Sequence, residues 1–432
     1  MKKFMFAAVA AAGIAAVSIG ASVTIDGVSW TYKVLNSSAG YVMLGGGTSE
    51  KPALAKTVQL NADSIPWTFE DRGRLYTVTE VGPYAFNECL IEGTLNIPPS
   101  VKKIGNRAFR KCSGIIQLDG MTNVTSVAEY AFFMCDNMAS SSSSLHLEKA
   151  SLLTGAFSGC SKFMNAQGSI MSVKNGTATL HPDLFNQNSM TGVIIPDTVT
   201  TVKDRVFQGS SALKAVVIPG PIDASKTCSV VANSNFANSP NLKYVMFGQN
   251  AKCSSKTIYN DNMFKDVPGC TVFAPKSGFS GVKFGGVNTD VVLYGSDTNI
   301  DITVDFQAKV ITAYCSDDTA IGKVEGAAPY FKTYCGGYTT RIISKPQSTG
   351  GTSSGSQSVE YYSSIVYYTP NQSEVDAVYN RLSGNVQNVI FDMTGATENI
   401  TMPGDTNTFI NVRMQGGAKY ISKKREFSII IR

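Results

Sequence analysis

Histidine, on which many enzymes and metal sites depend, is scarce in this chain: only His146 and His181 occur among 432 residues. A Ser–His–Asp or Cys–His site would need one of them beside a positioned partner, and neither lies in a nucleophile motif. No His/Cys pair has the spacing of zinc ligands, and no glycine-rich phosphate loop opens a helix. We therefore expect no catalytic residue, no metal site and no cofactor, and predict that the chain is not an enzyme.

Charge is also scarce, because charged residues make up only 16% of the chain and the net charge is +5. The one dense basic run, Lys423-Lys424-Arg425, is not accompanied by a basic stripe with interleaved aromatic residues. Such a stripe is typical of proteins that bind nucleic acid, so we expect no nucleic-acid partner. A low charge with abundant Gly, Ser, Thr and Asn indicates a turn-rich β protein.

Long apolar runs are missing except at the N-terminus, where the run from Phe4 to Val17 follows two lysines and precedes several small residues. This run is shorter than the roughly 20 residues that a spanning helix needs. The pattern predicts a secretory signal peptide over residues 1–21. We expect contact with a membrane only through this cleaved segment, and a mature protein that is secreted or held at the cell surface.

The chain does contain a repeat. In residues 100–112 (SVKKIGNRAFRKC), Phe109 is preceded by Val101, Ile104 and Ala108 and followed by Cys112. The same spacing, strict or weakened, surrounds eight phenylalanines: Phe86, Phe109, Phe132, Phe157, Phe185, Phe207, Phe236 and Phe264. Their separations are 23, 23, 25, 28, 22, 29 and 28 residues. A period in the twenties with one strand-like run in each period predicts a solenoid.

Short β-branched runs lie between these phenylalanines, for example at residues 95–97, 193–195, 216–218 and 245–247, and proline follows most of them. A three-residue strand cannot bury its inner face alone, so each strand must stack on its neighbour in parallel. Proline ends such a strand because it cannot donate to the ladder. The sequence therefore predicts a mainly β solenoid with one short parallel strand in each coil.

The motif from Ile97 to Cys112, I-P-x-S-V-x-x-I-G-x-x-A-F-x-x-C, resembles the BspA-like leucine-rich repeat of surface proteins from host-associated bacteria and some protists. The segment from Ile65 to Gly82 is similar to that family's first coil. The resemblance covers roughly residues 60–295. It implies a leucine-rich-repeat solenoid and a surface protein, and it specifies the ligand hardly at all.

We divide the chain into six parts. They are the signal peptide (1–21), an N-terminal β cap with the first coil (22–75), BspA-like leucine-rich repeats (76–298), a β segment (299–347), a Gly/Ser linker (348–358) and a C-terminal β-rich domain (359–432). Alternating runs at residues 28–34 and 41–44 predict a hairpin that caps the first coil. Residues 372–382 are compatible with one short helix.

Nine cysteines occur, and four of them hold the same place in successive coils: Cys89, Cys112, Cys135 and Cys160. Parallel stacking places such side chains roughly 4.8 Å apart and pointing the same way, which is poor geometry for a bridge. We therefore predict buried, reduced thiols that act as small apolar fillers. Cys315 and Cys335 end two similar strand-like runs and are the predicted disulfide. Cys228 and Cys253 are the second choice, which leaves Cys270 unpaired.

The middle residues of the strands are predicted to face outward, with pairs such as Ile116 and Leu118 facing inward. The outward residues are polar in the early coils (Asn96, Gln117 and His146) and apolar in the later ones (Ile194, Val217, Met246 and Phe273). An outward apolar row usually marks an interaction site, so the last four are the predicted partner-binding residues. A C-terminal region folded over the row would account for it equally well, and a one-residue shift in register would exchange the two faces.

We predict an exported leucine-rich-repeat binding protein, an adhesin that recognises a protein of a host, a matrix or a neighbouring cell. Two alternatives stay open. One is a structural component of an envelope or matrix that self-associates, and the other is a carbohydrate-binding or hydrolytic protein whose site lies after residue 300. The oligomeric state is open as well.

Overall fold

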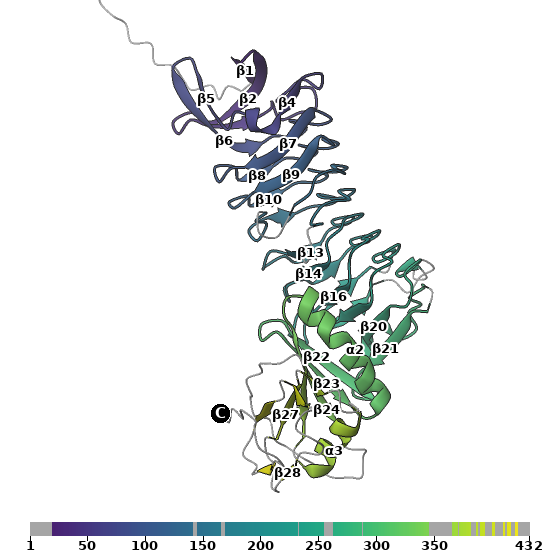
Figure 1. The fold of residues 1–432 in the computed structure, drawn as a ribbon. Helices are drawn as coiled ribbons and strands as arrows, with labels where there is room; N and C mark the ends of the chain where they lie inside the picture. Colours follow the sequence, from purple (N-terminus) through teal and green to yellow (C-terminus); the bar gives the residue numbers. More distant parts are fainter. Residues whose placement is uncertain are drawn as a thin grey trace, which may run out of the picture.

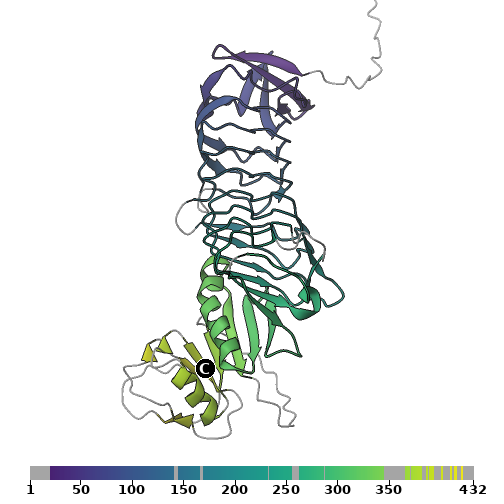
Figure 2. The ribbon, with the colours of Figure 1, turned by 90° about the vertical axis from the view of Figure 1, so that its right-hand side faces the viewer.

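The computed structural model describes residues 20–140, 145–165, 169–231, 233–254, 262–286 and 288–344, and then 365–369, 371–381, 386–387, 389–393, 400–401, 409–410, 413–415 and 420–421. Nearly all of the predicted signal peptide and the whole predicted linker (348–358) lie outside the described residues. The chain forms a stack of coils that carries an α/β unit at the end opposite to its N-terminus (Figures 1 and 2).

The N-terminal end is an antiparallel sheet that leads into the stack. Strands β1 (Ala21–Ile25), β2 (Val28–Asn36) and β3 (Tyr41–Leu44) pair in order, so the predicted hairpin is present as β2 and β3. Strand β3 then pairs in parallel with β6 (Arg74–Val81), which also pairs with β5 (Thr68–Asp71). Trp30 is buried and packs edge-on against Phe86, with ring centroids 6.3 Å apart, so it belongs to the core.

The repeats contribute strands to two series of parallel strands, one more than the sequence predicts. The first series, which follows β6, consists of two- and three-residue strands: β8 (Lys103–Ile104), β10 (Ser126–Val127), β11 (Ser151–Leu152), β13 (Thr179–Leu180), β15 (Thr201–Val202), β17 (Cys228–Val230) and β19 (Ala251–Cys253). The second series contains the predicted strands: β4 (Gln59–Asn61), β7 (Leu90–Ile97), β9 (Ile115–Gly120), β12 (Ile170–Ser172), β14 (Gly192–Ile194), β16 (Ala215–Ile218), β18 (Tyr244–Phe247), β20 (Thr271–Pro275) and β21 (Asp290–Tyr294). Two short helices, η1 (Ala62–Ser64) and α1 (Lys276–Phe279), flank the ends of the stack.

The repeated phenylalanines form the third side of each coil, which we call the wall. The rings of Phe86, Phe109, Phe132 and Phe157 stack with centroids 5.0, 5.3 and 5.2 Å apart, and all four are fully buried. A second stack joins Phe185, Phe207, Phe236 and Phe264 at 5.9, 5.5 and 5.0 Å. Between the two stacks, Phe163 packs on Phe157 at 4.3 Å. The repeated phenylalanines therefore lie in two stacks.

Two left-handed turns bracket most of the wall phenylalanines. Around Phe109 they lie at Arg107 (φ 51°) and Lys111 (φ 58°), two residues before and two after the ring. Non-glycine residues adopt this conformation at a cost of roughly 1–2 kcal/mol each. Hydrogen bonds between coils offset that cost, because backbone N–H groups of one wall donate to carbonyls of the next, as from Phe86 to Ala108 at 2.7 Å. The side chains at the turn positions are partly or fully exposed, as at Arg107 and Lys111.

The C-terminal part is one α/β unit, and the predicted separation into a β segment and a β-rich domain is wrong. Its sheet has the order β22 (Ile300–Asp305), β23 (Val310–Cys315), β24 (Thr339–Ser344), β25 (Ile365–Tyr368), β27 (Val389–Asp392) and β30 (Arg413–Gln415). Strand β22 is antiparallel to β23 and the others are parallel. Two small pairs join β26 (Val386–Gln387) to β29 (Phe409–Ile410) and β28 (Ile400–Thr401) to β31 (Tyr420–Ile421). Strands from both predicted segments therefore share one sheet.

Two helices connect the parallel strands. Helix α3 (Gln372–Arg381) matches the predicted helix, whereas α2 (Asp318–Tyr334) replaces a predicted strand at residues 331–335. Ala320, Val324 and Phe331 are buried at helical spacing, and the side chain of Asp317 accepts a hydrogen bond from the Ala320 N–H at 2.7 Å, which caps the helix. Among the described residues, no helix is both long enough and apolar enough to cross a membrane.

Candidate binding surface

The predicted apolar row is present, but three of its four residues are buried and the fourth, Ile194, is half-buried. The register places Val217 beside Met246 and Met246 beside Phe273 on β16, β18 and β20. All three side chains face away from the solenoid core, yet they are at most 1% exposed. They form a second hydrophobic core with residues of the α/β unit, among them Val324, Ala327 and Phe331 of α2.

Helix α2 is the element that covers this row (Figure 2). The ring of Phe331 packs edge-on against Phe273 at 6.3 Å, and Tyr330 packs against Tyr244 at 4.8 Å. Lys323 forms an ion pair with Asp290 of β21 at 2.9 Å. Further along the row, Ile194 lies against Gly336, just beyond the end of α2.

The four predicted partner-binding residues are therefore contacts between two parts of the same chain. The prediction that they form an open docking face is wrong, and the alternative, a C-terminal region folded over them, describes the structure. In the early coils, one predicted inward residue is also misplaced: Ile116 is 59% exposed, and Ile115 is buried instead. The pairing of β7 with β9 shifts register between Gly93 and Thr94, which moves this residue outward.

The predicted disulfide between Cys315 and Cys335 is not formed. Cys315 ends β23, whereas Cys335 follows α2, whose 17 residues span about 25 Å. Because the chain then re-enters the sheet as β24, parallel to β23, the helix returns it to the opposite end of the strands, away from Cys315. A disulfide requires Cα atoms within about 7 Å. Cys228 and Cys253, on the neighbouring strands β17 and β19, are not joined either.

The prediction for the four cysteines of the wall is confirmed, because all are buried thiols. They are more than apolar fillers. The Sγ of Cys112, Cys135 and Cys160 each donates to the carbonyl of the preceding wall phenylalanine, at 2.9 Å in every case. In the later coils, the hydroxyls of Ser210 and Ser239 make the same bond to Phe185 and Phe207, at 3.2 and 3.1 Å.

Neither histidine lies in a cluster of metal-ligating side chains among the described residues. His146 lies 3.8 Å from Glu148 at the surface, and partial burial lowers the pKa of His181. Within the described ranges, no group of three or more His, Cys, Asp or Glu side chains could hold a metal ion.

A different surface stands out on the wall of the early coils, and we call it the wall patch. Its central column consists of the residues two before each wall phenylalanine: Tyr84, Arg107 and Tyr130. The guanidinium carbon of Arg107 lies 5.6 Å from the Tyr84 ring centroid and 5.3 Å from that of Tyr130. Gly155 ends the column, because an added Cβ there would meet the Tyr130 ring at 2.5 Å. The three side chains are partly exposed.

A second column of the wall patch runs beside the first. Arg110 lies over the ring of Phe133 at 5.9 Å and forms an ion pair with Glu88 at 2.5 Å. Lys56 contacts the same carboxylate at 2.7 Å, so two cations share one acid. Met134 is 44% exposed next to Phe133. Tyrosine, arginine, phenylalanine and methionine are the residue types most enriched at protein interfaces.

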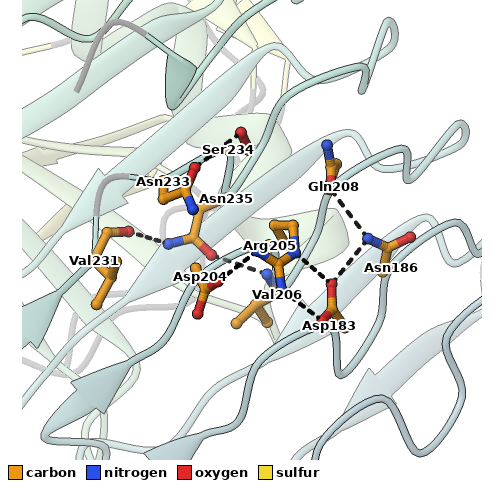
Figure 3. A network of polar contacts seen from close by, with 10 residues as sticks. All are labelled: Asp183, Asn186, Asp204, Arg205, Val206, Gln208, Val231, Asn233, Ser234 and Asn235. Atoms are coloured by element: carbon orange, nitrogen blue, oxygen red, sulfur yellow. Dashed lines mark hydrogen bonds and ion pairs between the residues drawn. The ribbon is translucent and has the colours of Figure 1, made fainter. Parts of the chain in front are cut away.

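On the wall of the later coils, the charged and polar side chains bind one another (Figure 3). Arg205 donates two hydrogen bonds to Asp183, at 2.8 and 3.0 Å, and contacts Asp204 at 2.6 Å. Asn186 donates to both Asp183 and Gln208. Sequence reasoning missed the wall patch, although Tyr84, Arg107 and Tyr130 recur at the same 23-residue spacing as the phenylalanines. That spacing places the three side chains one above the other on successive coils, and it could have revealed the patch.

Comparison with known proteins agrees with the motif. The family of BspA type leucine rich repeat regions matches the chain in six copies over residues 79–214 and 151–266. No curated protein sequence matches. Among solved structures, a leucine rich cell surface protein from Faecalibacterium prausnitzii is 15% identical, with 64% of this chain and 96% of that chain covered and a TM-score of 0.38.

Two further solved structures are similar to this chain over part of its length. A leucine-rich repeat protein from Bacteroides ovatus is 16% identical, with coverages of 61% and 76% and a TM-score of 0.31. The pneumococcal vaccine antigen PcpA is 11% identical, with coverages of 65% and 100% and a TM-score of 0.26. From the family match, the motif and the observed coils, we conclude that the repeats of this chain belong to the BspA-type leucine-rich-repeat family.

Proposed function

We propose that this protein is an exported adhesin, secreted or held at the cell surface, that binds a protein partner through the wall patch. The observation that carries the proposal is a group of partly exposed aromatic and arginine side chains on stacked coils, in a molecule whose apolar sheet face is already covered. Rigid coils reduce the conformational entropy that binding costs. Binding by surface complementarity needs no catalytic group.

The test is binding of the mature protein, from residue 22 to the C-terminus, to cultured epithelial cells. We expect saturable binding that mild trypsin treatment of the cells removes, because the partner is a protein. The double variant Tyr130→Ala/Phe133→Ala should weaken binding at least tenfold, since central aromatic residues dominate interface energies. A matched control is Asn96→Ala, which alters an exposed side chain on the sheet face of the same coils. Binding that survives trypsin, or that ignores the wall substitutions, would contradict the proposal.

A further inference from the structure

The wall patch contains an arginine without an acidic partner. Nη1 of Arg107 donates to the Tyr84 hydroxyl at 2.8 Å and to the Asn106 side-chain oxygen at 3.1 Å. Among the described residues, no carboxylate lies within ion-pair distance of this guanidinium. A guanidinium carries five N–H donors in its plane, and that of Arg107 lies near the rings of Tyr84 and Tyr130. The donors that these two hydrogen bonds leave unused therefore lie along its edge.

In the later coils, the arginine at the equivalent position binds carboxylates of the chain itself. Arg205 occupies the same place, two residues before a wall phenylalanine, with φ 55° against 51° for Arg107. Asp183 and Asp204 bind its guanidinium edge. In the early coils, Tyr84 stands where Asp183 would be, and Asn106 stands where Asp204 would be. The arginine is retained while both carboxylates are replaced by neutral residues.

We infer that Arg107 binds a carboxylate supplied by the partner, so that the partner presents an acidic segment to the wall patch. The inference rests on the proposed function and specifies its chemistry. Cations outnumber acids around the wall patch, where Lys56, Arg107, Arg110 and Lys111 stand against the carboxylates of Glu88 and Glu129. Phe133 and Met134 provide apolar contact for the neighbouring side chains of that segment.

The test uses a fluorescein-labelled dodecapeptide of alternating Glu and Ser, with a Gln/Ser peptide of equal length as its neutral control. Fluorescence anisotropy with the full mature chain should show binding of the acidic peptide that weakens in about 0.3 M salt, and little binding of the neutral one. Arg107→Gln should reduce affinity for the acidic peptide about tenfold or more, because it removes a charge-assisted hydrogen-bonding group. Arg205→Gln, which removes an arginine already paired within the chain, should change the affinity less than about twofold.

Equal binding of the acidic peptide by wild type and Arg107→Gln would overturn the inference. So would tight, Arg107-dependent binding of a heparin oligosaccharide that the acidic peptide does not displace, because the ligand would then be a sulfated glycan. The cell assay separates the two proposals. If Tyr130→Ala/Phe133→Ala abolishes cell binding while Arg107→Gln leaves it unchanged, the wall patch binds without a carboxylate and only this inference fails. If no wall substitution affects cell binding, both proposals fail.

Discussion

At the scale of single residues, the position three after most of the wall phenylalanines holds a small donor, and that donor need not be a cysteine. Thiols fill it in the early coils and hydroxyls fill it in later ones, with the same carbonyl acceptor. A hydrogen bond of this kind contributes about 1 kcal/mol net. The sequence predicted the burial of these cysteines from their spacing, but not the equivalence of Ser210 and Ser239, because nothing in composition marks a serine as a buried donor.

Cys135→Ser should therefore be tolerated far better than Cys135→Ala. The serine keeps a donor for the Phe109 carbonyl, whereas alanine removes the donor and leaves a small void. We expect Cys135→Ala to lower the free energy of unfolding by about 1–3 kcal/mol, and Cys135→Ser to cost less than half as much. Urea unfolding measures both. Equal losses in the two variants would show that the hydrogen bond does not matter.

The buried thiols also predict a loss of stability in alkali. Burial raises the pKa of Cys160 to about 12, whereas an unfolded thiol ionises near pH 8.5. The contribution of this thiol is complete below pH 8.5 and is lost as the pH rises toward 12, because only the unfolded state releases the proton. From pH 8.5 to pH 10, the free energy of unfolding should fall by up to about 2 kcal/mol more in wild type than in Cys160→Ser. Identical pH profiles of the free energy of unfolding in wild type and Cys160→Ser would contradict the raised pKa of Cys160.

At the scale of elements, the regular spacing of the repeats makes the solenoid predictable. Similarity between short stretches of sequence gives the wrong element where tertiary packing determines the secondary structure. Residues one period apart occupy the same place in successive coils, so the 23-residue period accounts for the stacked phenylalanines. Residues 331–335 resemble the strand that ends at Cys315, and for that reason they are predicted to form a strand. Buried residues at helical spacing from Ala320 to Phe331 instead make this stretch the end of α2. Ile116 was misplaced because a register shift in β9 cannot be read from alternation.

Helix α2 packs so closely on the solenoid that a glycine is required beneath it. An added Cβ at Gly192 would lie 2.0 Å from the Tyr334 carbonyl oxygen, whereas one at Gly322, within α2, would meet nothing within 4 Å. Gly192→Ala should therefore cost about 1–3 kcal/mol, and Gly322→Ala should stabilise the helix by up to about 1 kcal/mol. Chemical unfolding of the two variants checks this, and a Gly192→Ala protein as stable as wild type would mean that α2 does not rest on this coil.

At the scale of the whole molecule, the α/β unit determines which solenoid surface is left for a partner. It covers the apolar sheet face of the later coils through a shared core, while ion pairs within the chain satisfy the later wall. The exposed aromatic and arginine side chains of the early wall then form the candidate site. The sequence predicted the apolar row and correctly included a C-terminal cover as one explanation. The sequence does not distinguish a C-terminal cover from an external partner, because the residues of a strand do not specify which distant segment packs on them.

The most direct test of this account is to fix α2 to the solenoid and measure cell binding. Lys323 and Asp290, which form an ion pair across the contact, are replaced by cysteines and joined with a short bismaleimide. The native thiols should not react, because all nine are buried. The same double variant without the cross-linker serves as the control. The account predicts that cross-linked and untreated proteins bind epithelial cells with the same affinity, because the partner docks on the wall patch. Loss of binding on cross-linking would mean that α2 must leave the apolar row for the partner to bind, and would contradict the account.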